Sequence, residues 1–229
     1  MDPKLNRGNI EIYYNDHSIS SFLRKNIDSL SGKVLDIGCG KMKYKDFILK
    51  GKNVKEYIGL DLEEGKFTYS VKADLYWDGN KMPIEDNSID SAILFEVIEH
   101  CPDPSIVVRE AYRVLKPGGV ILFSTPFIYP LHGVPFDYSR PTPSGLEKLF
   151  TDAGFNKTTI EAGGSWDSSL AQIMAIWITK RPMPLILRKI LRLKFVPIFR
   201  FLLWLDKKQK DRLLEDGTMT PNLLGKSIK

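Results

Sequence analysis

Residues 33–40 read Lys33-Val34-Leu35-Asp36-Ile37-Gly38-Cys39-Gly40, a short apolar run that ends in two glycines. A run of this length that stops at Gly38 predicts a buried β-strand followed by a tight turn. Glycine suits the turn because it adopts backbone angles that other residues resist and lets a ligand approach the main chain. The helix expected next, over Lys43–Lys50, offers free N–H groups to an anionic or polar ligand group.

Short apolar runs and amphipathic stretches alternate from about residue 33 to residue 162. Strands that alternate with helices predict a parallel, doubly wound sheet in an α/β protein. The expected helices are Lys43–Lys50, Pro104–Leu115 and Pro143–Ala153. The expected strands are Lys33–Ile37, Glu56–Leu62, Tyr69–Ala73, Asp90–Phe95, Gly119–Ser124 and Phe155–Glu161.

Two aspartates follow expected strands at places where a nucleoside would lie. Asp61 ends the second strand, 21 residues after Gly40, and a carboxylate there can accept hydrogen bonds from both hydroxyls of a ribose. Asp74 is expected to end the third strand, where it can accept from an exocyclic adenine amine. Each aspartate taken alone is also typical of a helix cap or a turn.

Several segments, in their order along the chain, resemble the class I S-adenosylmethionine-dependent methyltransferases over roughly residues 30–162. These segments are Asp36-Ile-Gly38-Cys-Gly40, Asp61, Ala73-Asp74-Leu75, Pro83-Ile-Glu-Asp86-Asn-Ser-Ile-Asp90, Phe95-Glu-Val-Ile-Glu-His100 and Leu115-Lys-Pro-Gly118-Gly119. The resemblance implies a Rossmann-like, mostly parallel seven-stranded sheet of order 3-2-1-4-5-7-6 with a reversed seventh strand. It also implies S-adenosylmethionine as the cofactor.

The resemblance assigns a place to each expected cofactor residue. It implies that the two glycines pass under the methionine part, that Asp61 holds the ribose, and that Asp74 with Leu75 borders the adenine. Phe95 and Glu96 then face the sulfonium end, with His100 one turn further on. The expected cofactor-binding residues are Asp36, Gly38, Gly40, Tyr44, Asp61, Leu62, Asp74, Leu75, Phe95, Glu96 and His100.

The glycine turn departs from the commoner family pattern, which has a third glycine where this chain has Met42. The turn resembles that of a subgroup with an aromatic residue at Tyr44, and Lys41 or Tyr44 is a candidate contact to the methionine carboxylate. An NAD-dependent oxidoreductase is a weaker alternative, because its G-x-G-x-x-G pattern would need a glycine at Lys43. A non-catalytic scaffold or binding module on the same fold is another alternative.

Residues 126–142 follow the fifth strand and read Pro-Phe-Ile-Tyr-Pro-Leu-His-Gly-Val-Pro-Phe-Asp-Tyr-Ser-Arg-Pro-Thr. A loop this long indicates function, and ligands bind at this edge of open α/β sheets. His132 is a candidate base, Asp137 a residue that orients it or serves instead, and Arg140 a grip for an anionic acceptor. Asp137 and Arg140 can equally pin the loop to the fold. A similar segment occurs in a bacterial subgroup associated with surface glycan or lipid pathways, which suggests a small or lipid-linked acceptor, such as a sugar hydroxyl.

The basic charge of the chain lies in one late segment. Residues 180–212 carry 11 Lys and Arg side chains and two Asp, a net charge of +9, whereas the whole chain carries +5. The mildly acidic remainder argues against nucleic acid as a partner. Residues 185–205 are long enough to span a bilayer, but five internal cations disfavour spanning. The segment 182–212 can instead lie on an anionic membrane surface, cap the acceptor pocket or form a dimer interface.

The sequence therefore divides into an N-terminal helical segment (1–30), a cofactor-binding core (31–165), a basic apolar helical insertion (166–215) and a last stretch (216–229). Asn222–Lys229 is expected to supply the seventh strand, and the rival layout gives that place to Leu170–Thr179. Cys39 and Cys101 have no ligand-like spacing, the N-terminus has no apolar signal core, and no metal site is expected. These features predict a cytoplasmic protein, with peripheral contact to the inner membrane face as an option.

Overall fold

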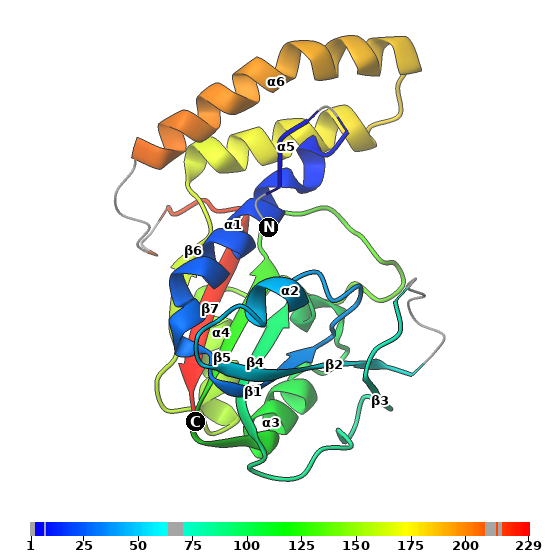
Figure 1. Ribbon diagram of the computed structural model, residues 1–229. Helices are drawn as coiled ribbons and strands as arrows, with labels where there is room; N and C mark the ends of the chain where they lie inside the picture. Colours follow the sequence, from blue (N-terminus) through cyan, green and yellow to red (C-terminus); the bar gives the residue numbers. More distant parts are fainter. Residues whose placement is uncertain (1–2, 7, 64–70, 209–213, 215–216) are drawn as a thin grey trace.

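A seven-stranded sheet forms the centre of the computed structural model, which describes residues 3–6, 8–63, 71–208, 214 and 217–229 (Figure 1). Its strand order is β3-β2-β1-β4-β5-β7-β6, which confirms the predicted order. Neighbouring strands from β3 to β5 run parallel, and β7 runs antiparallel to both β5 and β6. The strands are β1 (Gly32–Ile37), β2 (Val54–Leu62), β3 (Leu75–Trp77), β4 (Ile89–Phe95), β5 (Leu115–Pro126), β6 (Thr159–Ala162) and β7 (Asn222–Ile228).

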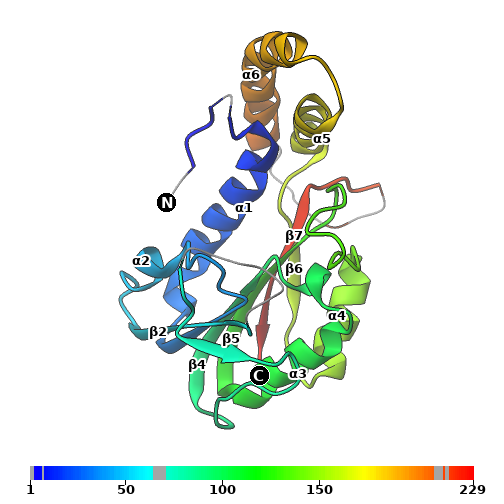
Figure 2. The ribbon, with the colours of Figure 1, turned by 90° about the vertical axis from the view of Figure 1, so that its right-hand side faces the viewer.

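Helices cover both faces of the sheet, so its central strands are buried on both sides (Figure 2). Helices α1 and α2 cover one face, and α3 and α4 cover the other. Side-chain caps fix where two of them start: Asp103 accepts from the backbone N–H of Ser105, and Thr142 from that of Gly145. The bounds are α1 (Ile10–Asn26), α2 (Lys45–Ile48), α3 (Pro104–Val114) and α4 (Pro143–Asp152), with two 3₁₀ helices, η1 (Ile27–Ser29) and η2 (Ile98–His100).

The C-terminal strand β7 lies between β5 and β6 and completes the sheet. Gly225 allows this insertion, because a Cβ atom there would stand 2.0 Å from the Phe123 ring of β5. The preferred layout of the last strand is therefore confirmed. The rival layout is wrong, since Leu170–Thr179 lies within helix α5 (Trp166–Lys180).

The third strand differs from its prediction. The predicted segment was Tyr69–Ala73, of which residues 69 and 70 lie outside the described residues and 71–73 are not in a strand. The strand is Leu75–Trp77, which pairs with Leu60–Leu62 of β2. Leu75 and Trp77 pack into the core, whereas Tyr76 between them is exposed. This alternation is typical of a β-strand and explains why these three residues pair with β2.

Helices α5 and α6 (Leu185–Lys208) form a separate helical layer at the end of the molecule toward which the parallel strands point (Figure 1). Their shared core also includes the start of α1. Helix α6 continues through Pro197, which lies inside it. None of the helices in the described ranges combines the length and apolar character needed to cross a membrane. The residues of this core are Ile10, Tyr14, Ala171, Ala175, Ile178, Phe195, Phe199 and Leu202.

Candidate functional site

A cavity of about 290 Å³ lies at the carboxyl ends of β1, β2 and β4. Ligands bind at this edge of open α/β sheets, so the cavity is where the strand pattern predicts it. It is lined by Ile37, Gly38, Asp61, Leu62, Trp77, Asp78, Gly79, Asn80, Glu96, Val97, His100, Cys101, Pro102, Asp103, Ile106, Val107 and Phe136.

The glycine turn forms the floor of the cavity. Gly38 has a φ of 72°, and a Cβ atom there would stand 2.4 Å from Val97, so a larger residue would be strained and would fill the space. Met42, which replaces the family's third glycine, has a φ of 52°. The turn therefore keeps a left-handed backbone at this position although the side chain is not glycine.

Asp61, the residue expected to bind the ribose, contacts the glycine turn and also lines the cavity. Its carboxylate accepts hydrogen bonds from the backbone N–H of Gly40 at 2.9 Å and of Leu62 at 2.8 Å. A carboxylate has about four lone-pair sites, which leaves capacity for hydroxyl donors in the cavity that Asp61 lines. Gly40 itself does not line the cavity, so its part is to orient Asp61.

Asp74 and Leu75 do not line this cavity, and their place beside the adenine stays a prediction. Asp74 precedes β3 rather than ending it, accepts from the backbone N–H of Gly59 at 2.8 Å, and lies 3.7 Å from Lys45. The residues that line the cavity after β3 are Trp77, Asp78, Gly79 and Asn80. The turn signal Asp78-Gly79-Asn80 directly after an apolar triplet could have located this edge from the sequence.

Asp36, Tyr44 and Phe95 support the cavity without lining it. Asp36 accepts a hydrogen bond from the Tyr57 hydroxyl, and burial raises the pKa of its carboxyl to about 7. The rings of Tyr44 and Phe95 meet edge to face with centroids 5.5 Å apart. These three predicted cofactor residues lie in or beside the core between the sheet and helices α1 and α2.

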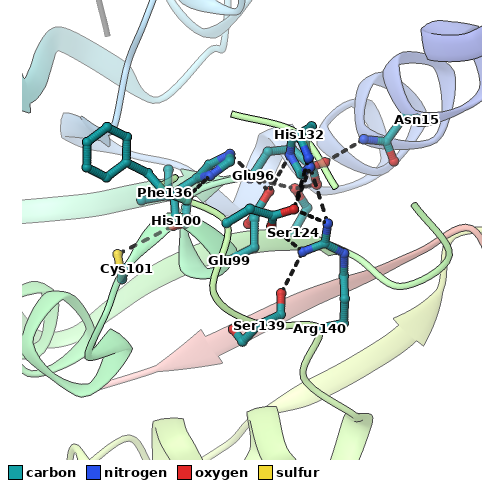
Figure 3. Close-up of polar contacts among 12 residues, drawn as sticks. Asn15, Glu96, Glu99, His100, Cys101, Ser124, His132, Phe136, Ser139 and Arg140 are labelled. Carbon is teal, nitrogen blue, oxygen red and sulfur yellow. Dashed lines mark hydrogen bonds and ion pairs between the residues drawn. The ribbon is translucent and has the colours of Figure 1, made fainter. Parts of the chain in front are cut away.

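Glu96 stands where the expected sulfonium end of the cofactor would lie. It accepts hydrogen bonds from Ser124 of β5 at 2.8 Å and from Asn15 of α1 (Figure 3). Burial raises the pKa of its carboxyl, and these two bonds oppose that shift. The part of Asn15 had no signal in the sequence, because it depends on α1 crossing this end of the sheet.

The loop after β5 places His132, Asp137 and Arg140 together, as predicted. Asp137 is buried; it accepts from Arg140 at 2.6 and 2.9 Å and from the backbone N–H of His132 at 2.9 Å. The bonds from Arg140 lower the pKa of Asp137 to about 2, so Asp137 is a poor proton acceptor near neutral pH. Asp137 and Arg140 therefore brace the loop.

His132 and His100 meet beside the cavity, with ring centroids 4.8 Å apart. Burial and the neighbouring His100 lower the pKa of His132. The Nδ1 atom of His100 lies 2.6 Å from the carbonyl oxygen of Phe136, which fixes a proton on that nitrogen. The loop is thus held against η2 at the rim of the cavity.

Comparisons with known proteins agree with this geometry. Residues 35–123 match the family model of a methyltransferase domain. A protein of Mycolicibacterium smegmatis named "Probable S-adenosylmethionine-dependent methyltransferase" is 36% identical over 53% of this chain and 51% of its own. A ubiquinone biosynthesis O-methyltransferase of Pseudomonas savastanoi is 33% identical over 41% of this chain and 44% of its own.

The alignments thus span about half the length of these relatives. An S-adenosylmethionine-dependent methyltransferase of Archaeoglobus fulgidus shares the fold, with a TM-score of 0.56 at 18% identity over 96% of this chain and 97% of its own. The family match coincides with the strands that build the cavity. Residues 35–123 therefore carry a methyltransferase domain, and S-adenosylmethionine is the cofactor that the sequence relatives and the fold indicate.

Proposed function

We propose that this protein transfers the methyl group of S-adenosylmethionine to a hydroxyl group of a small or lipid-linked acceptor, such as a sugar. The observation that carries the proposal is the continuity of two sites. The cavity formed by Gly38, Asp61 and Glu96 reaches His100 and Phe136, and this pair borders the loop that holds His132.

The described residues suit the cofactor. The space over Gly38 admits a ligand against the main chain, Asp61 accepts from ribose hydroxyls, and Asp78 with Asn80 lies where the adenine would end. The cofactor supplies a methyl group on a positively charged sulfur. Glu96 is placed to face that positive charge, which favours binding of the sulfonium form over the neutral product.

Methyl transfer requires the acceptor oxygen, the methyl carbon and the sulfur in line. The braced loop 126–142 would position the acceptor, with Asp137 and Arg140 fixing its shape. A hydroxyl acceptor loses a proton as the new bond forms. His132 is neutral near pH 7 because its pKa is lowered, so its lone pair can assist that loss. The word O-methyltransferase in the name of the Pseudomonas relative favours oxygen as the acceptor atom.

Titration calorimetry with S-adenosylmethionine and S-adenosylhomocysteine tests the cofactor half of the proposal. Wild type should bind both, and Asp61→Ala should bind both at least about 10-fold more weakly, because charge-assisted hydrogen bonds are lost. Absence of binding by the folded wild type would refute the proposal. Binding without turnover on a panel of glycan and lipid-linked hydroxyl acceptors would favour the scaffold alternative.

The helical layer supports a second part of the proposal, contact with an anionic membrane surface that presents the acceptor. Exposed apolar side chains recur at helical spacing on both helices, and 182–212 is strongly basic. Among the described residues, none from α5 or α6 lines the cavity described above, which disfavours a cap. The exposed large apolar residues are Trp166, Leu170, Ile173 and Trp177 on α5, and Leu185, Ile186, Leu187, Ile190, Leu193, Ile198, Phe201 and Trp204 on α6.

Liposome sedimentation tests this part independently of catalysis. Vesicles rich in anionic lipid should retain the protein at low salt, and neutral vesicles should not, because the attraction is electrostatic and screened by salt. Equal retention by both vesicles would refute it. A dimer in analytical ultracentrifugation that loses its association with Trp204→Glu would favour the dimer interface instead.

A further inference from the structure

Glu99, in the 3₁₀ helix η2, carries a buried carboxyl group that has no hydrogen-bond partner on either oxygen. Its side chain is 0% exposed. A buried polar group without a partner typically costs about 1–3 kcal/mol, and more if it is charged. The fold therefore holds an acidic group in a place that, as it stands, disfavours its charge.

Two histidine rings turn toward this carboxyl group (Figure 3). Oε1 of Glu99 lies 3.8 Å from Nε2 of His100 and 3.9 Å from Nε2 of His132. One potential ligand atom from each of the three residues lies within 4.8 Å of the others. Metal–ligand bonds of about 2.0–2.2 Å set neighbouring ligand atoms roughly 3–3.5 Å apart, so a bound ion would draw the three side chains slightly inward.

The far side of each ring lies against a backbone carbonyl. Nδ1 of His100 lies 2.6 Å from the carbonyl oxygen of Phe136, and Nδ1 of His132 lies 3.3 Å from that of Pro130. Metal-binding histidines usually donate their second N–H to such a group, which leaves the other nitrogen free of its proton and facing the ion. Nδ1 of His132 also lies 3.2 Å from a guanidinium nitrogen of Arg140. Metal binding at Nε2 would leave the proton on Nδ1, and this proton would favour the contact with the carbonyl oxygen of Pro130.

The surrounding charges favour a cation. Glu96 lies in the same cluster of side chains as Glu99 (Figure 3), so the two carboxylates together can balance a divalent ion. The guanidinium of Arg140 is the opposing charge beside the cluster, and it is engaged by two hydrogen bonds to Asp137.

We infer that Glu99, His100 and His132 form a binding site for a divalent transition-metal ion at the rim of the cofactor cavity. Two imidazoles and one carboxylate are a ligand set suited to Zn²⁺, Fe²⁺, Mn²⁺ or Co²⁺, and three protein ligands leave coordination positions open. The role of the ion rests on the proposed function: it would bind the acceptor hydroxyl and lower its pKa. The proton then leaves to solvent, the oxygen–carbon bond forms and the carbon–sulfur bond breaks. With the ion bound, His132 serves as a ligand; in the metal-free protein it keeps the role of assisting the loss of the proton.

Metal binding is tested on tag-free protein that has been treated with a chelator and then titrated with Mn²⁺, Zn²⁺ or Co²⁺ in a calorimeter. Wild type should bind one equivalent of ion. Glu99→Gln and His132→Gln should each bind at least about 10-fold more weakly. His17→Gln is the matched control, because His17 is the third histidine of the chain and lies in α1. No saturable binding by wild type, or equal binding by Glu99→Gln and wild type, would overturn the inference.

A second measurement needs no variant and holds even if Glu99→Gln fails to fold. Substoichiometric Mn²⁺ should broaden the ring-proton NMR signals of two histidines and spare that of His17. Broadening of all three alike, or of none, would overturn the inference. Calorimetry with S-adenosylhomocysteine on the metal-free protein separates the two proposals, since its binding depends on Asp61 and would persist if the metal site were absent.

Discussion

Replacement of Asp36 by asparagine should change how the stability of this protein depends on pH. Asp36 is 4% exposed and accepts a hydrogen bond from Tyr57. Burial raises the pKa of its carboxyl from 3.8 to about 7, and the bond from Tyr57 offsets part of that rise. Between these two pH values the folded protein keeps the proton and the unfolded chain releases it.

The sign and size of the effect follow from this difference. Because the folded state binds more protons, the free energy of unfolding falls as pH rises, by about 1.4 kcal/mol per pH unit. Over the interval from 3.8 to about 7 the loss amounts to roughly 4 kcal/mol, and the curve is flat above that range. Asparagine keeps the volume and can still accept from Tyr57, but it has no proton to lose.

Urea unfolding followed by circular dichroism, repeated from pH 4.5 to pH 8, measures the free energy of unfolding of both proteins. The advantage of Asp36→Asn over wild type should grow with pH and level off near pH 7. Tyr57→Phe is the matched control. Loss of the hydroxyl removes the bond that lowers the pKa of Asp36, so the fall in stability should continue to higher pH. Parallel curves for Asp36→Asn and wild type would refute the assignment of a neutral, buried Asp36.

Three further outcomes are expected. Gly38→Ala should abolish binding of S-adenosylhomocysteine in calorimetry, because its Cβ atom would stand 2.4 Å from Val97 at a φ of 72°. The far-ultraviolet circular dichroism spectrum should stay native. Normal binding would contradict the close approach of the ligand to Gly38. Phe199→Ala, in the core of the helical layer, should lower the free energy of unfolding by about 3–5 kcal/mol, and a loss below about 1 kcal/mol would show that this layer is not packed as described. Hydrogen bonds from Ser165, Ser168 and Tyr14 lower the pKa of the buried Asp206, so its stabilising effect is present at neutral pH and is lost as pH falls. Asp206→Asn should therefore weaken the fall in the free energy of unfolding at acidic pH, measured by urea unfolding. The same fall at acidic pH in Asp206→Asn and wild type would count against this role of Asp206.

The meeting of Asp61 and Glu96 at one cavity could be predicted because it follows from strand ends. Asp61 lies at the end of β2 and Glu96 follows β4, and the carboxyl ends of parallel strands meet at one edge of the sheet. The third strand was misplaced, at Tyr69–Ala73 in place of Leu75–Trp77, for the opposite reason. A strand of three residues carries no usable periodicity, so the boundary had to be set by the pairing of Leu75–Trp77 with β2.

The cluster of Glu99, His100 and His132 could not be predicted, and no metal site was expected from the sequence. His132 lies 32 residues after His100, which is not a local ligand spacing. The loop from β5 returns over η2 because backbone groups join them, including the N–H of Tyr138, which donates to the carbonyl oxygen of Glu99 at 2.8 Å. Main-chain contacts of this kind do not depend on side-chain identity, so no sequence pattern records them.

Helix α1 shows why the segment that the family model covers does not contain every residue that shapes the site. Two consecutive residues of this helix serve different parts of the molecule. The hydroxyl of Tyr14 lies in hydrogen-bond distance of Asp206 of α6 and of the carbonyl oxygen of Gly163, both at 3.0 Å, so it fixes α1 to the helical layer. The amide of Asn15 donates to the carboxylate of Glu96, which lines the cavity. Adjacent residues of α1 thus contact the helical layer and Glu96 of the cavity. Residues outside 35–123 are therefore needed both to orient Glu96 and to hold α1 where it can do so.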